Sequence, residues 1–262
     1  MKEDHKAERF FAAYIYVTQT EHDAVARMYD WKECHYDGDN QVYLEAEMTK
    51  GDHTVKVVAA RQDEMGMTAS ATLSMKLIQR YRPMYLIMPG IAAGTGEEKE
   101  EDQLYGDVLL ADAVWNYSNG KYVSPSKATI RFGDVGFLPR PTFAYADKKL
   151  LPYFQQAVES EENQCHVHIG HIACGNTVVA NRRILQKQIQ SQNTETKGLE
   201  MEGYGVAYAA NHCAEPRPYA IIAKSVCDFA DSKKADQYQR FAAYTSCEFV
   251  KFLSEKILPE EL

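Results

Sequence analysis

Short apolar runs alternate along the chain with longer segments of helical periodicity. The runs are rich in β-branched and aromatic residues, as in strands buried on both faces. They fall at residues 11–18, 54–60, 84–88, 107–114, 167–173 and 219–226. Helical patterns lie at residues 22–31, 68–81, 148–159, 178–190, 204–212 and 235–257. This alternation predicts an α/β fold, a three-layer αβα sandwich whose central sheet is mixed and mostly parallel.

The alternation continues without a repeat or a linker rich in Pro, Gly or Ser. We therefore expect a single domain over residues 1–262, with residues 1–10 as an N-terminal extension. Two segments are predicted loops. Residues 97–103 are a charged run, which is typical of a solvated loop without a catalytic role. Residues 118–146 contain the turn-forming sequences N-G, S-P-S and P-R-P.

Composition narrows the class of partner. The chain has 262 residues, 45% of them hydrophobic and 25% charged, with a net charge of −8, as in an ordinary globular protein. This acidity argues against a nucleic acid or an anionic membrane as the main partner and favours a small molecule. No apolar run approaches the roughly 18 residues that span a bilayer. Six cysteines without a C-x-x-C pair and the absence of a secretory signal predict a cytoplasmic protein.

Candidate chemistry lies just after the predicted strands, where ligands bind in open α/β sheets. Residues 19–23, 90–94 and 227–231 follow predicted strands, and a fourth candidate segment, residues 198–202, lies just before the predicted helix at 204–212. The glycines in 90–94 would let backbone N–H groups approach an oxyanion, a water or a phosphate, although a strand-to-helix turn needs glycine as well. The segment matches neither a dinucleotide-binding nor a P-loop motif, so no cofactor is expected.

Three carboxylates stand out in these segments. Glu200 and Glu202 would point the same way on an extended backbone and could accept hydrogen bonds from the paired hydroxyls of a sugar. A helix N-terminus, which favours acidic residues, explains them equally well. Asp228 follows an almost wholly apolar strand, so partial desolvation would suit it to act as a general acid. The alternative for Asp228 is a turn or helix-capping role.

A metal site is not predicted. His166 and His168 would share one face of a strand, and Cys165 and His171 lie close by in sequence. However, no carboxylate or second cysteine sits at ligand spacing from them. A cysteine nucleophile is not predicted either, because no Cys lies beside a recognisable His and Asn pair.

Taken in order, the four segments resemble the nucleoside phosphorylase superfamily, which includes purine nucleoside and uridine phosphorylases and the methylthioadenosine/S-adenosylhomocysteine nucleosidases. The resemblance covers about residues 14–253 and is closest to the nucleosidase branch. It implies that Glu21, in the sequence V-T-Q-T-E, is the general base that activates water. It also implies that Ala92 and Ala93 line the nucleophile and ribose side of the site.

The resemblance assigns further roles in substrate binding and catalysis. In the E-M-E sequence of Glu200, Met201 and Glu202, the methionine would pack under the sugar and Glu202 would hold the 2′ and 3′ hydroxyls. The Cys227-Asp228 pair is similar to a signature whose aspartate handles purine N7. Tyr238 falls where the nucleosidases place an aromatic ring against the sugar.

Two departures from the family pattern affect the predicted site. Many nucleosidases stack an aromatic residue on the base after a Gly-Asp or Gly-Asn pair, whereas Val178 and Val179 are expected there in this chain. The early phosphate loop of the phosphorylases is absent, and Met88 stands where they have an arginine. Without guanidinium groups, free phosphate would lack bidentate partners, which favours water as the nucleophile.

The resemblance therefore implies hydrolysis of the N-glycosidic bond of a purine nucleoside or a 5′-modified purine nucleoside or nucleotide, with no cofactor and no metal. Phosphorolysis of a purine nucleoside remains an alternative. Another is a nucleotide-binding signalling module without turnover, in which Arg61, Arg131 and Arg140 would bind 5′-phosphates beneath residues 118–146. Members of the family assemble from at least two subunits, so a homo-oligomer is expected.

Overall fold

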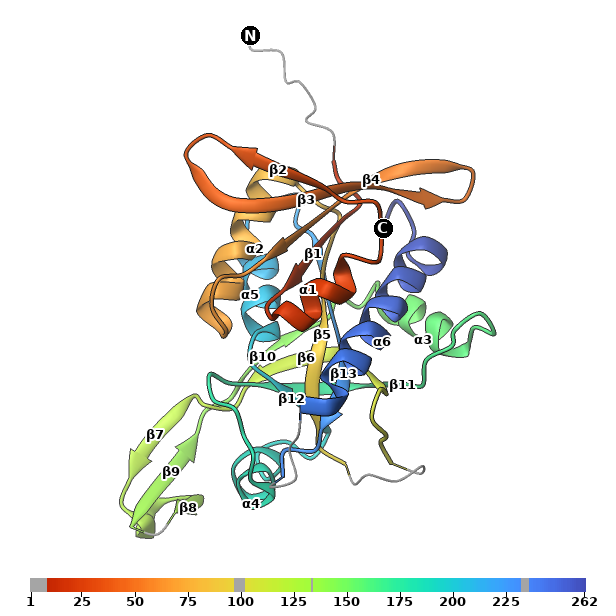
Figure 1. Cartoon of the computed structure of the whole chain (residues 1–262). Helices are drawn as coiled ribbons and strands as arrows, with labels where there is room; N and C mark the ends of the chain where they lie inside the picture. Colours follow the sequence, from red (N-terminus) through yellow and green to blue (C-terminus); the bar gives the residue numbers. More distant parts are fainter. Residues whose placement is uncertain (1–8, 97–101, 133, 232–235) are drawn as a thin grey trace.

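A ten-stranded sheet runs through the middle of the molecule (Figure 1). The computed structural model describes residues 9–96, 102–132, 134–231 and 236–262. The strands of this sheet are β1 (Ala12–Tyr16), β2 (Lys32–Tyr36), β3 (Asp39–Lys50), β4 (His53–Arg61), β5 (Tyr85–Gly94), β6 (Val108–Asn116), β10 (Thr142–Tyr145), β11 (Val167–Cys174), β12 (Thr196–Glu200) and β13 (Tyr219–Asp228).

The strand pairings close part of this sheet into a ring. The order is β10-β6-β11-β12-β5-β1-β4-β3-β2, and β13 pairs with both β5 and β6. β13 runs parallel to β5 and antiparallel to β6, so β5, β13, β6, β11 and β12 form a closed circuit of hydrogen-bonded neighbours. The sheet is mixed, as predicted, but it is not mostly parallel, because five of the ten pairings between the described strands are antiparallel, among them the hairpin pairs β2–β3 and β3–β4.

Helices cover both faces of the sheet (Figure 1). On one face, α2 (Met67–Tyr81) and α5 (Gly203–His212) pack in one hydrophobic core through residues such as Leu77 and Val206. On the other face, α1 (Gln19–Val25), α3 (Leu151–Glu159) and α6 (Gln239–Phe252) share a second core through Val25, Phe154 and Phe249. The predicted three-layer αβα arrangement is confirmed.

Short helical turns complete the described chain. They are η1 (Pro125–Lys127), α4 (Arg182–Ile184), η2 (Leu185–Gln190), η3 (Asp236–Tyr238) and η4 (Leu253–Ile257). In the parts of the chain that the structure describes, none of the helices combines the length and the apolar character that a membrane crossing demands.

The predicted strands are all present, and the strands that were not predicted are mainly short or polar. β2 and β3 lie at the edge of the sheet, where one face meets water. Such strands alternate polar and apolar residues and have no continuous apolar run. The charged run predicted as a loop at residues 97–103 lies largely outside the described residues.

One predicted loop and one predicted turn contain strands instead. Residues 118–146 contain a separate three-stranded sheet of β7 (Gly120–Val123), β8 (Ile130–Phe132) and β9 (Val135–Pro139), followed by β10. The Gly, Pro and Ser residues there mark turns between short strands. The segment 90–94 is not a turn, because β5 continues through Gly90 to Gly94.

Candidate active site

A cavity of about 210 Å³ opens where β5, β12 and β13 end, beside the segment that follows β11. It is lined by all but one of the residues predicted for the site, namely Glu21, Ala92, Ala93, Val178, Val179, Glu200, Met201, Glu202, Cys227 and Asp228. Strands that are distant in sequence meet here because the ring of pairings brings their ends together.

The exception is Tyr238. The ring of Tyr238 stacks on Tyr105 with the two centroids 3.9 Å apart and an interplanar angle of 16°. Its neighbour Gln239 lines the cavity instead. The structure therefore places Tyr238 in an aromatic pair outside the lining, because the turn η3 directs its ring toward Tyr105.

Glu21 is held by backbone donors at the start of α1. One carboxylate oxygen, Oε2, accepts hydrogen bonds from the N–H groups of Val17 at 3.0 Å and Thr18 at 2.8 Å. The other, Oε1, accepts one from the N–H of Ile91 at 3.1 Å. Thr18 in turn caps the backbone of Glu21, which completes a capping box. The T-x-x-E sequence signals this box, and it starts α1 at Gln19 rather than at the predicted residue 22.

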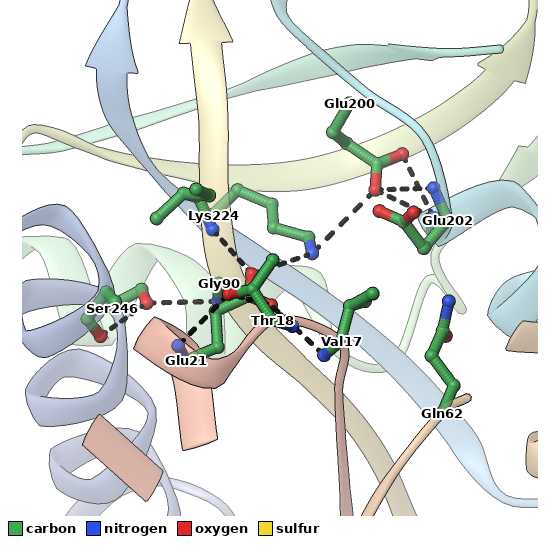
Figure 2. A network of polar contacts seen from close by, with 12 residues as sticks. Val17, Thr18, Glu21, Gln62, Gly90, Glu200, Glu202, Lys224 and Ser246 are labelled. Atoms are coloured by element: carbon green, nitrogen blue, oxygen red, sulfur yellow. Dashed lines mark hydrogen bonds and ion pairs between the residues drawn. The ribbon is translucent and has the colours of Figure 1, made fainter. Parts of the chain in front are cut away.

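Lys224 is a site residue that the sequence analysis missed. Its side chain is 1% exposed, and its Nζ lies 4.0 Å from Oε1 of Glu21 and 3.8 Å from Oε2 of Glu200. Figure 2 shows this ammonium group between the two carboxylates. Although burial opposes the charged form, the carboxylates of Glu21, Glu200 and Glu202 raise the pKa of Lys224. A single lysine inside an otherwise apolar strand is the signal that could have found it.

Glu200 stabilises the start of α5. Its carboxylate accepts hydrogen bonds from the backbone N–H groups of Glu202 and Gly203, each at 2.9 Å. This is the helix N-terminus role that the sequence left open for the pair. Glu200 thus lines the cavity and also fixes the backbone that carries Glu202.

Glu202 is a buried hydrogen-bond acceptor in the cavity, and its pKa is raised. It is 7% exposed, and its Oε1 accepts a hydrogen bond of 2.8 Å from the backbone N–H of Gly66, at the start of α2. Burial and the neighbouring carboxylate of Glu200 raise its pKa to about 7, although Lys224 and the Gly66 hydrogen bond act in the opposite direction. When the pKa of a carboxyl group lies near 7, hydroxyl groups that donate hydrogen bonds to it shift it toward its ionised form.

Gly90 allows the close approach of these groups. Its φ of 143° lies in a region that residues with a side chain rarely adopt. A Cβ at this position would overlap Oε1 of Glu21 and lie 2.8 Å from Nζ of Lys224. The N–H of Gly90 donates to Oγ of Ser246 on α6 at 3.0 Å (Figure 2). Glycine at this position therefore leaves room for the carboxylate of Glu21 and the ammonium group of Lys224 to meet.

Asp228 ends β13 and is 3% exposed. Its Oδ1 accepts a hydrogen bond of 2.8 Å from the N–H of Ala230, so it also has the turn role considered above. The register between β13 and β5 shifts just before Asp228, which then pairs with Ala93. Bulges of this kind re-aim side chains next to functional sites. Glu21 accepts a hydrogen bond from Ile91 of the same strand. The positions of β5 that the two acids contact, Ile91 and Ala93, are two residues apart, or about 7 Å along the strand.

The rest of the lining is mostly aliphatic. Val178 and Val179, which follow β11, line the cavity together with Leu199 and with Ala92 and Ala93 of β5. None of the described residues that line the cavity is aromatic. The described lining therefore offers aliphatic side chains where the resemblance would place an aromatic ring.

His166 and His168, at the start of β11, have a carboxylate partner, so the reason given above against a metal is wrong. Nδ1 of His166 and Nε2 of His168 lie 3.0 and 2.8 Å from Oδ2 of Asp107. Parallel pairing of β6 with β11 brings Asp107 beside them across a gap of 59 residues in sequence. This cluster does not contribute to the cavity lining.

Residues 24–255 match the family model of the phosphorylase superfamily. The chain belongs to the phosphorylase superfamily. The resemblance inferred from the four sequence segments is thereby confirmed.

Several proteins of known sequence or structure are similar to this phosphorylase superfamily member. An uncharacterized protein, y4jS, of Sinorhizobium fredii is 27% identical over 244 residues, which is 87% of this chain and 56% of that protein, so the chain spans little more than half of its length. The 5′-methylthioadenosine/S-adenosylhomocysteine nucleosidase of Bacillus subtilis is 26% identical over 215 residues, 80% of this chain and 86% of that one.

A solved structure supports the same fold. The 5′-methylthioadenosine/S-adenosylhomocysteine nucleosidase of Neisseria meningitidis, in complex with methylthio-immucillin-A, superposes with a TM-score of 0.73 at 20% identity. The superposition covers 94% of this chain and 98% of that one. The mixed sheet with helices on both faces is therefore the fold of the superfamily.

The arginines considered for phosphate binding do not gather at the cavity of this superfamily member. Arg61 lies near its edge and donates to the backbone O of Val17 at 2.7 Å and to Oε1 of Gln19 at 2.8 Å. Arg131 belongs to β8, and Arg140 follows β9. None of the three is among the described residues that line the cavity.

Proposed function

We propose that the chain is an N-ribosyl hydrolase that cleaves the N-glycosidic bond of a purine nucleoside or a 5′-modified purine nucleoside and releases the free base. The observation that carries this proposal is that Glu21, Glu202 and Asp228 line one cavity. Family membership and the similarity to the nucleosidase of Bacillus subtilis support it.

Each acid has a separate role in this mechanism. The transition state resembles a ribosyl oxocarbenium ion that separates from a departing purine anion. Asp228, in its protonated form, donates its proton to N7 of the leaving base as the glycosidic bond breaks. Glu202 accepts hydrogen bonds from the ribose hydroxyls and places negative charge near the growing cation. Glu21 takes a proton from the attacking water. The hydrogen bonds that Glu21 accepts at both oxygens support this role, since they fix its position.

The charge of the cavity favours water over phosphate as the nucleophile. Four carboxylates line it, those of Glu21, Glu200, Glu202 and Asp228. No lysine or arginine is among the described lining residues, and the ammonium group of Lys224 is already placed between two carboxylates. A phosphate ion would meet like charge without a bidentate partner, whereas a cationic sugar would be stabilised.

The proposal also covers the domain organisation, the cellular compartment and the assembly of the protein. We infer one domain in a cytoplasmic homo-oligomer, with no nucleic acid, membrane or metal in the reaction. Phe241 and Tyr244 support the oligomer, since they lie one turn apart on α6 and are 53% and 45% exposed. Light scattering coupled to size-exclusion chromatography tests it, and a monomer at all concentrations would contradict it.

The decisive experiment follows product identity. Inosine, adenosine and methylthioadenosine are incubated with the protein, with and without phosphate, and the released bases and sugars are separated by chromatography. We expect free base and free ribose or its 5′-modified form, at a rate independent of phosphate. Ribose 1-phosphate formed only with phosphate would establish phosphorolysis instead. Tight binding of a nucleotide in a calorimetric titration, without any released base, would establish a nucleotide-binding module instead.

A pair of variants tests the assignment of the general acid. Asp228→Asn should lower turnover about a hundred- to ten-thousandfold, the usual cost of losing a placed acid. Asp63→Asn is the matched control, because Asp63 is an exposed aspartate outside the cavity lining. Near-normal turnover in Asp228→Asn would reject its role.

A further inference from the structure

Three metal-binding side chains meet at the start of β6 and β11, outside the catalytic cavity. Asp107 directly precedes β6, His166 directly precedes β11, and His168 is the second residue of β11. Because Val108 pairs with Val167 in parallel register, Asp107 and His166 are cross-strand neighbours. Residues two apart on a strand point to the same face, so His168 joins them there.

The donor atoms are already at the spacing of a ligand set. Oδ2 of Asp107 lies 3.0 Å from Nδ1 of His166 and 2.8 Å from Nε2 of His168. One ligand atom from each of the three residues lies within 4.8 Å of the others. Two ligands at about 2.1 Å from a zinc ion are roughly 3.0 to 3.4 Å apart. The two carboxylate–imidazole distances are therefore close to those around a bound ion, and the side chains need only open slightly around the ion.

The carboxylate is fixed before any ion arrives. The backbone N–H of Leu104 donates to Oδ2 of Asp107 at 2.9 Å, an outer contact of the kind that orients metal ligands. The side chains of Asp107 and His168 are 7% and 18% exposed, whereas that of His166 is 62% exposed. Asp107 and His168 are therefore held within the fold, whereas the exposed side chain of His166 leaves the site accessible to ions from solution.

The donor set indicates the class of ion. Two imidazoles and one carboxylate suit borderline transition metals such as Zn²⁺ or Co²⁺, whereas Mg²⁺ and Ca²⁺ prefer oxygen ligands alone. Three protein ligands leave a fourth position for water.

We propose that Asp107, His166 and His168 bind one divalent transition-metal ion of the zinc class, and that this ion stabilises the junction of β6, β11 and β13. Asp107 is tied to β13 by its backbone, because the N–H of Val226 donates to its carbonyl O at 2.9 Å. The N–H of Gly106 returns a hydrogen bond of 2.9 Å to the carbonyl O of Val226. The ion thus reinforces three strands and takes no part in the proposed hydrolysis.

The test uses the full untagged chain, stripped of metal with a chelator that is then dialysed away. Calorimetric titration with Zn²⁺ should give one ion per chain, and Co²⁺ should produce visible absorption bands of a low-coordinate site. The variants His166→Gln and His168→Gln should each weaken Zn²⁺ binding at least tenfold. Zn²⁺ should raise the melting temperature of the original chain and leave that of the double variant unchanged.

His53→Gln is the matched control. His53 also contacts two carboxylates, since its ring nitrogens lie 3.4 Å from Asp52 and 3.0 Å from Glu260, but these exposed groups are not part of a three-ligand cluster. Zn²⁺ binding should be unchanged in this variant. Circular dichroism confirms that each variant is folded. Of the two ligand variants, His166→Gln should disturb folding less than His168→Gln, because His166 is the more exposed.

The proposal is overturned if the original chain binds Zn²⁺ no more tightly than the double variant. It is also overturned if His53→Gln loses as much affinity as His168→Gln. Either result would mean that the three side chains form only a hydrogen-bonded cluster. Because the readouts are binding, absorption and melting temperature, they do not depend on the nucleosidase proposal.

Discussion

The ammonium group of Lys224 lies 4.0 Å from the carboxylate of Glu21, and the two side chains are 1% and 3% exposed. The same ammonium group lies 3.8 Å from Glu200, which caps the helix that begins after Glu202. One buried cation therefore connects the proposed base, through Glu200, to Glu202, the residue proposed to bind the sugar. Removing either partner would leave an uncompensated charge in the interior, which is far more costly than losing an exposed ion pair.

Lys224→Met should destabilise the protein by about 3–5 kcal/mol, because buried carboxylates would lose their counter-ion. Urea denaturation followed by fluorescence measures the loss in the free energy of unfolding. Lys121→Met is the control, since Lys121 is exposed on β7. Equal stability losses in the two variants would show that the buried cation does not hold the carboxylates together.

Glu21→Gln should lower turnover by about a hundred- to ten-thousandfold, because glutamine keeps the shape of the side chain but cannot accept a proton from water. Steady-state assays with saturating nucleoside measure this effect. Asp23→Asn, on an exposed position of the same helix, should retain normal turnover. If both variants stay active, Glu21 serves only as the cap of α1.

The sequence predicts those parts of the site that depend on local pattern. Apolar runs locate most of the strands, and Glu21 and Asp228 follow two of them, whereas Glu202 was found just before a predicted helix; the structure gathers all three in one cavity. Polarity along an edge strand carries a weaker signal, so β2 and β3 were missed. Turn residues in 118–146 were interpreted as one loop, although each separates two short strands.

Contacts between distant segments explain what local pattern could not predict. The hydrogen bond from Gly66 to Glu202 joins residues 136 positions apart. The pairing of Asp107 with His166 depends on the register of two parallel strands. A single sequence contains neither the register nor the closure of the ring, so these partners appear only once the fold is known.

Gly90→Ala should cost more stability than an ordinary glycine substitution. The left-handed φ contributes about 1–3 kcal/mol of strain, and the added Cβ would push the carboxylate of Glu21 away from Lys224. Turnover should fall together with stability. Gly38→Ala separates the two causes, because Gly38 has a φ of 78° but no atom within 4 Å of its would-be Cβ. Equal losses in the two variants would assign the whole effect to backbone strain.

The raised pKa of Glu202 makes stability depend on pH. In the folded chain this pKa is about 7, against 4.5 for an unperturbed glutamate. Between these values the folded state holds a proton that the unfolded state has released. The contribution is fully present below about pH 4.5 and is lost as pH rises through 7, by on the order of 3 kcal/mol.

Glu202→Gln should remove this dependence. The difference in unfolding free energy between the original chain and the variant is measured by urea denaturation at several pH values from 4.5 to 8. The original chain should lose stability relative to the variant as pH rises. A constant difference would show that Glu202 titrates alike in the folded and unfolded states.

The same titration predicts proton release when a nucleoside binds. Hydroxyl donors favour the ionised carboxylate, so contact with the ribose should lower the pKa of Glu202 from about 7. Near pH 7 the free protein carries roughly half a proton on this group, which binding should expel. Calorimetric titration of the slow variant Asp228→Asn, completed before appreciable hydrolysis and repeated in buffers of different ionisation enthalpy, counts the protons released. Adding Glu202→Gln to this variant should abolish the release, whereas proton uptake would mean that Glu202 binds the sugar in its protonated form.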